Sequence, residues 1–505
     1  MLNIINKFKT EFKWQALAII GLTTIAYGFL VNNINLWLDE IYSVLMAKDS
    51  FSQMWVLLTT EDSKPPLYYL YLKLILKLFP QAYEIAAAHW GSVILLLAAQ
   101  IFAATAVKRD YGEKTALWLM ILIALLPQSL WLGLEVRTYM LSSLLLLMAS
   151  VFGARLLNNP SKIDYVKFGL VSVLALYSHY YCALYLMFLY GLIFVLLIKD
   201  KKRKTSGMGF ILTAISVALL FAPWLYVPLH TAHDISKIWY VNHDFVLFSW
   251  QFFVNPLPPE IVQSVYFIAT TLSASLFSFL LILGLVNARK LDLTPRRMII
   301  LTVGCFVLTY ALLLVLSQFV RPMVTARYLK IFSVPLYLGS AVIIAKYKEI
   351  AKAVLVVLLI GFYFTYIDIR TISFDKGYQN AIQDVRKYIS PDTPLLVTDN
   401  SNLFCEYFLP EYKCLLLHNG RGEILRLPKV ADNLPYYDFE LNQSVFSLSI
   451  YHVIHSADSC NEYSSMYRLG QNVRLCRFDN MDTVKDLLDN SFDFISSRTS
   501  NLKPQ

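Results

Sequence analysis

Long apolar stretches alternate with short polar segments along the first 369 residues of the chain. Blocks such as Gly21–Val31, Val93–Val107 and Met140–Val151 contain no charged residue. Crossing the hydrocarbon core of a bilayer takes about 20 residues of helix, and about eleven windows qualify. The pattern predicts an α-helical polytopic membrane protein with spans near residues 14–34, 82–107, 115–132, 138–157, 165–178, 183–198, 207–228, 262–287, 298–318, 328–345 and 353–369.

The distribution of Lys and Arg predicts how these spans are oriented. Basic residues concentrate in the N-terminal tail and in alternate connections, including those around Lys108, Lys162 and Lys346. The positive-inside rule assigns such segments to the cytoplasm. Because no small-residue cleavage site follows the first span, we interpret it as an uncleaved anchor. We therefore expect a multi-pass protein of the cell membrane (plasma or inner membrane) with a cytoplasmic N-terminus and an extracytoplasmic C-terminus.

Two further segments differ from the spans in pattern. The predicted outer loop 35–81 contains amphipathic stretches at 41–47, 51–58 and 67–79, which favour helices along the membrane surface. From residue 370 the chain alternates short apolar runs, near 395–399, 413–417, 445–454 and 473–478, with helical patterns at 378–389 and 484–488. The sequence thus predicts a transmembrane domain over 1–369 and a small extracytoplasmic α/β domain over 370–505.

Composition argues against a soluble globular protein and against a nucleic-acid-binding protein. Apolar residues make up 57% of the chain and charged residues 16%, whereas a soluble domain has about 25% charged residues. The net charge of +9 comes from residues 1–369, while residues 370–505 have slightly more acidic than basic side chains. The positive charge therefore matches membrane topology and anionic lipid headgroups, and it does not indicate a nucleic-acid partner.

Cysteine positions agree with this organisation. Cys182 and Cys305 lie in apolar stretches and are expected to be core residues. The other cysteines all follow residue 370, which suggests one or two disulfides in an extracytoplasmic domain; a reduced set remains the alternative. Three pairings are open for Cys405, Cys414, Cys460 and Cys476.

Charged residues near the spans gather on the predicted outer side, whereas a coupled transporter places carboxylates near the midplane. Asp39-Glu40 could supply a general base or hold a metal, or could simply form an acidic first turn of a helix. Lys64 could bind phosphate or be an interfacial lysine, and Glu135 and Arg137 could form a local salt bridge. Arg327 could bind phosphate in a bidentate manner or extend to the interface.

Five short motifs together resemble the GT-C superfamily of polyprenyl-phosphate-sugar-dependent glycosyltransferases, most closely the branch of protein O-mannosyltransferases and lipid A aminoarabinose transferases. The resemblance covers roughly residues 14–346. The motifs are Asp39-Glu40, Lys64-Pro65-Pro66-Leu67-Tyr68-Tyr69, Glu135-x-Arg137-x-Tyr139, Ser178-His179-Tyr180-Tyr181 and Arg327-Tyr328-Leu329.

The resemblance implies an enzyme that moves a sugar from a polyprenyl-phosphate carrier to an acceptor on the extracytoplasmic face, with inversion. Asp39 would be the general base, Glu40 would support it, and Glu135 would occupy the second acidic position. The donor-phosphate-binding residues would be Lys64, Arg137 and Arg327. The residues lining the site would be Tyr68, Tyr69, Tyr139, His179 and Tyr328.

Some members of this superfamily need a divalent metal, but the sequence has no clear ligand set, so no tight metal site is expected. The acceptor could be a lipid, a glycan or a protein. Two hypotheses from other classes remain. A lipid-linked glycan flippase or transporter would move its substrate without turnover. A receptor-like protein would use the spans only as an anchor, for which eleven spans are excessive.

Overall fold

The computed structural model describes residues 2–231 except 33, 61–63, 159 and 200–203, and residues 290–373 except 320–322 and 325. Between 232 and 289 it describes a few residues, and beyond 373 chiefly the helix and strands given below. The chain divides into two compact units. The first comprises 1–33, 47–257 and 262–370, and the second comprises 34–46, 258–261 and 371–505.

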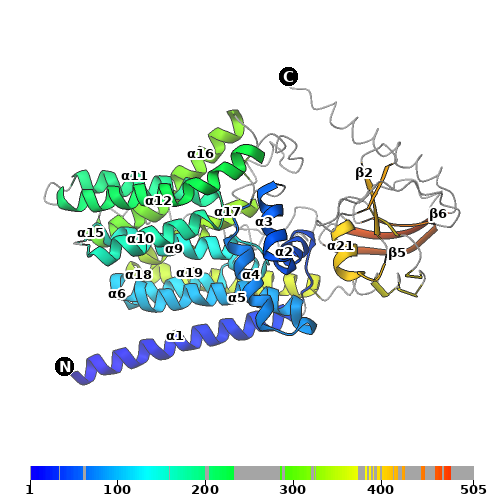
Figure 1. The fold of residues 1–505 in the computed structure, drawn as a ribbon. Coiled ribbons are helices and arrows are strands. Elements are labelled where there is room, and N and C mark those ends of the chain that lie inside the picture. Colours follow the sequence, from blue (N-terminus) through cyan, green and yellow to red (C-terminus); the bar gives the residue numbers. More distant parts are fainter. Residues whose placement is uncertain are drawn as a thin grey trace. The chain divides into compact units, whose positions relative to one another are not determined.

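The first unit is a bundle of helices that lie side by side (Figure 1). Its longer helices are α1 (Leu2–Val31), α5 (Glu84–Phe102), α7 (Glu113–Leu125), α9 (Tyr139–Arg155), α10 (Lys162–Leu176), α11 (Tyr181–Lys199), α12 (Lys204–Thr231), α16 (Cys305–Phe319), α18 (Ser333–Lys346) and α19 (Lys348–Ser373). Shorter ones are α3 (Phe51–Thr60), α4 (Leu67–Leu78), α6 (Lys108–Tyr111), α8 (Pro127–Leu134), α15 (Leu293–Ile299) and α17 (Ala326–Leu329). Short turns complete them: the 3-10 helices η1 (Gln81–Tyr83) and η8 (Lys330–Phe332), and the π-helical turns η2 (Ala103–Val107) and η7 (Ile300–Gly304).

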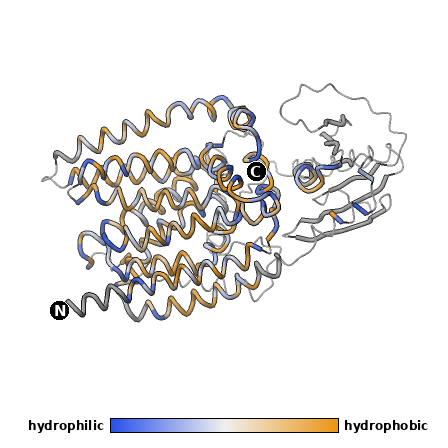
Figure 2. The backbone as a smooth tube through the Cα atoms, turned by 60° about the horizontal axis from the view of Figure 1, so that its bottom comes forward, coloured by the Kyte–Doolittle hydropathy of each residue, from blue (hydrophilic) through white to orange (hydrophobic). Residues whose placement is uncertain are grey.

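Several of these helices are long and apolar enough to cross a bilayer. Five single helical segments qualify among the described residues: 11–31, 81–111, 181–199, 207–230 and 293–319. The pair α7 and α8 would add a sixth span if it counts as one, and two shorter apolar helices cover 139–155 and 351–367. Figure 2 shows hydrophobic positions along most of the length of these helices. The predicted membrane-embedded helical protein is confirmed, while most of the window 262–287 lies outside the residues described.

Local chemistry explains where the helices break. The window 115–132, expected to be one straight span, bends by 71° between α7 and α8. Pro127 stands at the first turn of α8, where proline is tolerated, and it cannot continue the helix before it. Gly112 has a φ of 87° directly after α6, a conformation that favours glycine at helix ends. Ser161 and Asp164 form a capping box that begins α10.

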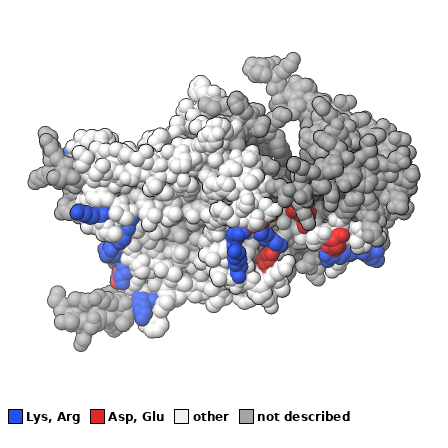
Figure 3. All heavy atoms as spheres, viewed as in Figure 1, with Lys and Arg blue, Asp and Glu red and all other residues white. Residues whose placement is uncertain are grey.

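Among the described residues of the first unit, charged side chains gather near the ends of the bundle. On the face shown in Figure 3, Lys and Arg gather at two positions along the helices, and the surface between them is uncharged. One end contains an ion pair of Lys108 with Glu113 (3.0 Å) and one of Arg155 with Asp110 (2.6 Å). This distribution suits helices whose middle sections contact lipid, because charge is costly within the hydrocarbon region.

The second unit contains a six-stranded sheet in the order β3-β2-β1-β4-β6-β5. The strands are β1 (Leu395–Val397), β2 (Cys414–His418), β3 (Glu423–Arg426), β4 (Val445–Ser449), β5 (Asn461–Arg468) and β6 (Gln471–Phe478), with α21 over Ser401–Phe408. Strand β1 pairs in parallel with β2 and β4, and the remaining pairs are antiparallel. The predicted α/β composition is confirmed. The predicted helix at 484–488 lies outside the described residues, as does most of that at 378–389.

Helix α2 (Leu38–Lys48) carries the two acidic residues singled out in the sequence. The Glu40 carboxylate accepts a hydrogen bond from the Trp37 backbone N–H at 3.0 Å, immediately before the helix. This is half of a capping box, so the structure bears out the alternative of an acidic first turn for Glu40. Asp39 is half-buried, whereas Glu40 is buried.

The described cysteines differ between the units. Cys182 and Cys305 are buried and free, as expected of core residues. Cys405 in α21 is buried and disulfide-bonded. The disulfide agrees with the expectation of at least one bridge after residue 370.

Candidate functional site

Three connections of the first unit come together through hydrogen bonds between distant segments. The Leu67 backbone N–H, at the start of α4, donates to the Tyr177 carbonyl at 3.1 Å. Thr138, just before α9, donates through Oγ1 to the Ser178 carbonyl at 2.7 Å. The Ser142 and Ser178 hydroxyls are 2.8 Å apart. These bonds hold the Lys64-Pro65-Pro66 segment, the start of α9 and the turn between α10 and α11 beside one another.

The connection between α8 and α9 is a tight turn with two buried charged side chains. The Arg137 N–H donates to the Glu135 carbonyl at 2.8 Å, which closes the turn. Helix α5 holds it, because the Ser92 hydroxyl donates to the Glu135 carbonyl at 2.6 Å and His89 Nδ1 lies 2.6 Å from the Leu134 carbonyl. Glu135 and Arg137 are each only 8% exposed. Buried charges of this kind require partners or a ligand.

Glu135 has such a partner in Lys330. The Lys330 ammonium lies 2.9 Å from Glu135 Oε2, and both side chains are less than 10% exposed. The ion pair connects the turn after α8 to η8, across 195 residues of sequence. Glu135 was expected to be catalytic or to pair locally with Arg137. In the structure its carboxylate forms this long-range ion pair, which the sequence did not predict.

His179 lies in a cluster of tyrosine rings. Its ring centroid is 6.0 Å from that of Tyr139 and 5.4 Å from those of Tyr181 and Tyr328. The Tyr181 and Tyr328 rings are 4.9 Å apart, and the Tyr181 hydroxyl donates to the Met323 carbonyl at 2.5 Å. Three predicted lining residues, Tyr139, His179 and Tyr328, therefore contact one another. We call this group, with Tyr181, the aromatic cluster.

Burial and two nearby cations keep His179 neutral. Desolvation by burial, followed by the positive charges of Arg137 and Lys64, lowers the pKa of His179 to about 3. The Tyr181 N–H donates to His179 Nδ1 at 3.1 Å, so Nδ1 is the unprotonated nitrogen and Nε2 carries the hydrogen. The shift also shows that Lys64 and Arg137 lie within electrostatic reach of the same imidazole.

Other predicted site residues have different surroundings. Tyr68 and Tyr69 are buried in α4, and their rings contact each other with centroids 6.0 Å apart. Arg327 lies in α17, and its side chain is outside the described part of the structure. Asp39 and Glu40 belong to the second unit, so their convergence with Lys64 and Arg137 stays a prediction.

Sequence reasoning missed two contributors to this arrangement. Lys330 was not among the site residues predicted from the sequence, and Tyr181 appeared only as part of a motif. The signal for Lys330 was present, because it is an isolated cation directly before the apolar run from Ile331 to Ile344. No group of three His, Cys, Asp or Glu side chains suited to a metal ion occurs among the residues that the structure describes.

Comparisons with known proteins agree on one superfamily. Residues 63–227, about a third of the chain, match the family described as dolichyl-phosphate-mannose-protein mannosyltransferase. That range includes Lys64, Glu135, Arg137 and His179. No curated protein matches the sequence of the chain.

Two solved structures share the fold over most of their length. ArnT from Cupriavidus metallidurans in the apo state aligns with a TM-score of 0.59 and 11% identity, covering 91% of this chain and 97% of ArnT. The same protein bound to undecaprenyl phosphate aligns with a TM-score of 0.57 and 10% identity, with the same coverage. The sequence match and the shared fold together confirm the resemblance of this chain to the GT-C superfamily of glycosyltransferases.

Proposed function

We propose that this protein is a membrane glycosyltransferase that takes a sugar from a polyprenyl-phosphate carrier and transfers it to an acceptor on the extracytoplasmic face. The observation that carries the proposal is the gathering of Lys64, Arg137 and the aromatic cluster within one fold. That fold is shared with ArnT, which has been solved with undecaprenyl phosphate bound. Two cations that act on one imidazole, Arg137 buried and Lys64 half-buried, suit a phosphate leaving group.

The cations would act on the bond that breaks. During transfer, the bond between the anomeric carbon and the phosphate oxygen breaks while the acceptor oxygen bonds to that carbon. Negative charge grows on the departing phosphate, and preorganised cations stabilise it without reorganising in the reaction. Lys64 and Arg137 are proposed for this role, and Arg327 is proposed as a third cation on sequence grounds. A single displacement inverts the anomeric configuration.

The acceptor must lose a proton as it attacks, and Asp39 is the proposed general base. A carboxylate within hydrogen-bond reach of the acceptor hydroxyl would take that proton. Glu40 caps α2 through its bond to the Trp37 N–H, which supports a role in fixing the helix that carries Asp39. The proposal requires Asp39 to approach the anomeric carbon opposite the phosphate.

Glu135 is better suited to holding the site than to proton transfer. Its carboxylate is buried and paired with the Lys330 ammonium at 2.9 Å. This pair fixes the turn from which Arg137 extends, so we assign Glu135 and Lys330 as positioning residues. The neutral His179 offers a hydrogen-bond donor at Nε2 and does not add a third positive charge beside Lys64 and Arg137.

The proposal is tested by sugar transfer in vesicles that contain the full-length protein. Dolichyl-phosphate mannose is the first donor to try, given the family match, followed by other polyprenyl-phosphate sugars. Asp39→Asn should lower the rate of polyprenyl-phosphate release by about 10²–10⁴-fold, the usual contribution of a general base. Asp49→Asn, at the end of the same helix–loop segment, is the matched control and should retain activity.

Two results would contradict the proposal. Wild-type activity in Asp39→Asn would remove the assigned base, and lipid-linked sugar that crosses the bilayer unchanged would indicate a transporter. The cations give a separate criterion, because Lys64→Ala should raise the KM for the donor more than that for the acceptor.

A further inference from the structure

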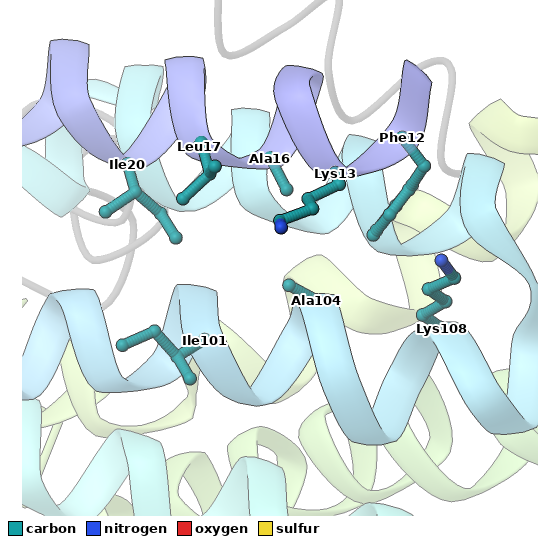
Figure 4. A pocket seen from close by; sticks show the side chains of 8 residues that line it. All are labelled: Phe12, Lys13, Ala16, Leu17, Ile20, Ile101, Ala104 and Lys108. Carbon is teal, nitrogen blue, oxygen red and sulfur yellow. The ribbon is translucent and has the colours of Figure 1, made fainter. Parts of the chain in front are cut away.

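A cavity of about 270 Å³ lies between α1 and the continuous helix formed by α5, η2 and α6. Two lysines and six apolar side chains or aliphatic positions line it: Phe12, Lys13, Ala16, Leu17, Ile20, Ile101, Ala104 and Lys108 (Figure 4). None of these residues takes part in the candidate functional site. The proposed glycosyltransferase function leaves this cavity unexplained.

The lining changes from charged to apolar along the direction of the helices. One wall runs from Lys13 to Ile20 and the other from Lys108 back to Ile101. Each stretch covers seven helical steps, or about 10 Å at 1.5 Å per residue. Lys13 lies near the start of the candidate span 11–31, and Lys108 lies near the end of the candidate span 81–111. Both lysines are thus at the membrane boundary, and the apolar part of the cavity extends toward the bilayer interior.

Both ammonium groups are turned into the space between the helices (Figure 4). The Lys108 Nζ lies 3.8 Å from the centre of the Phe12 ring and 3.0 Å from Glu113 Oε1. Phe12 is 5% exposed and closes one side of the cavity. Two cations with one carboxylate leave the mouth with a net positive charge, which suits a phosphate group.

We propose that this cavity binds an anionic phospholipid of the bilayer. Its phosphate contacts Lys13 and Lys108, and an acyl chain lies along Leu17, Ile20 and Ile101. The charge of the mouth and its position at the ends of two spans select a lipid phosphate over a soluble anion, because the apolar wall continues into the membrane. The bound lipid fills the space between α1 and the rest of the bundle. This inference does not depend on the proposed function.

Lipid retention by the purified full-length protein tests the inference. The protein is placed in nanodiscs of phosphatidylcholine with limiting phosphatidylglycerol, and the co-purified lipid is measured by native mass spectrometry. The wild type should retain about one phosphatidylglycerol per chain in preference to phosphatidylcholine. Lys13→Gln with Lys108→Gln should reduce this retention about thirtyfold, since each basic residue near a membrane surface strengthens the binding of an anionic lipid about fivefold.

Two further variants make the test specific. Arg109→Gln with Lys114→Gln removes the same charge from exposed positions at the same end of the bundle and should leave retention unchanged. Ala104→Phe fills the cavity without changing charge and should reduce retention. Equal losses in both double variants would mean diffuse surface charge and would overturn the proposal. Undiminished retention in Ala104→Phe would also overturn it, as would displacement of phosphatidylglycerol by equimolar undecaprenyl phosphate.

Discussion

His179 illustrates how neighbouring side chains decide the state of a single residue. It lies among tyrosine rings, and the charges of Arg137 and Lys64 act on its imidazole. A lone histidine beside tyrosines is more often a structural residue that forms hydrogen bonds. The Tyr181 N–H bond to Nδ1 agrees with that interpretation. A neutral His179 adds no third positive charge beside these two cations.

The lowered pKa of His179, about 3 against an ordinary value of 6.5, predicts how stability depends on pH. Between these values the unfolded chain binds a proton that the folded chain does not, so this residue destabilises the fold as pH falls from 6.5 toward 3 and has no effect above 6.5. The stability of the His179→Gln variant should therefore fall less steeply than that of the wild type as the pH drops from 6.5 toward 3. Thermal melts of both proteins at pH 4.5 and 7.5 measure the difference, and identical pH dependence would contradict it.

The buried pair of Glu135 and Lys330 predicts an asymmetric response to mutation. Lys330→Met leaves the Glu135 carboxylate buried without its partner, which costs about 3–5 kcal/mol in such cases. Adding Glu135→Leu should recover much of the loss, because replacing both partners by apolar groups is often neutral. Denaturation in detergent measures these changes.

Lys48→Met is the control for that series. The Lys48 side chain is 40% exposed and pairs with Glu84 at 3.1 Å. An exposed pair contributes about 0–1 kcal/mol, so this variant should melt close to the wild type. Equal losses in Lys48→Met and Lys330→Met would show that the Glu135 pair has no special role.

At the scale of helices, the apolar windows of the sequence predicted where several helices lie. They did not predict where a helix breaks. The spans near 14–34, 183–198 and 207–228 correspond to α1, α11 and α12, because each is one long, mainly apolar stretch without a charged residue. The bend before Pro127 divides a window that contains no charged residue on either side and few polar ones. Hydropathy does not register such a break, since it depends on a backbone hydrogen bond that proline lacks.

The candidate site shows the same division between what a sequence can and cannot predict. The motifs identified Lys64, Arg137, Tyr139, His179 and Tyr328, and these are residues that the structure brings near one another. The partner of Glu135 could not be predicted, because Arg137 is two residues away whereas Lys330 is 195 residues away. Only the packing of η8 against the turn after α8 selects the distant cation.

Gly133 tests how closely the helices pack behind this turn. A Cβ atom there would lie 2.5 Å from Leu96 Cδ1 and 2.7 Å from Tyr27 Cε1. Gly133→Ala should therefore destabilise the protein by about 1–3 kcal/mol, the usual cost of overpacking. Gly191→Ala in α11 is the control, since nothing lies within 4 Å of its Cβ position and alanine favours helix. A melting temperature of Gly133→Ala equal to or above that of Gly191→Ala would contradict this packing.

For the whole molecule, the fold class predicted from the sequence agrees with the structure. The apolar bundle, the change of pattern after residue 370 and the strands of the second unit were all expected. Periodicity reveals such elements because burial imposes it along each segment. The grouping of 34–46 with the second unit was not expected, since its amphipathic pattern resembles that of the adjoining helices α3 and α4.

The central claim is that Lys64 and Arg137 bind the phosphate of a polyprenyl carrier, and the most direct measurement is the Kd of the full-length protein for undecaprenyl phosphate. Lys64→Gln with Arg137→Gln should raise this Kd at least about tenfold, because charge-assisted hydrogen bonds each contribute about 1.5–3 kcal/mol. Lys48→Gln with Lys77→Gln removes the same charge from exposed positions and should leave the Kd unchanged. An unchanged Kd in the first double variant would contradict the account.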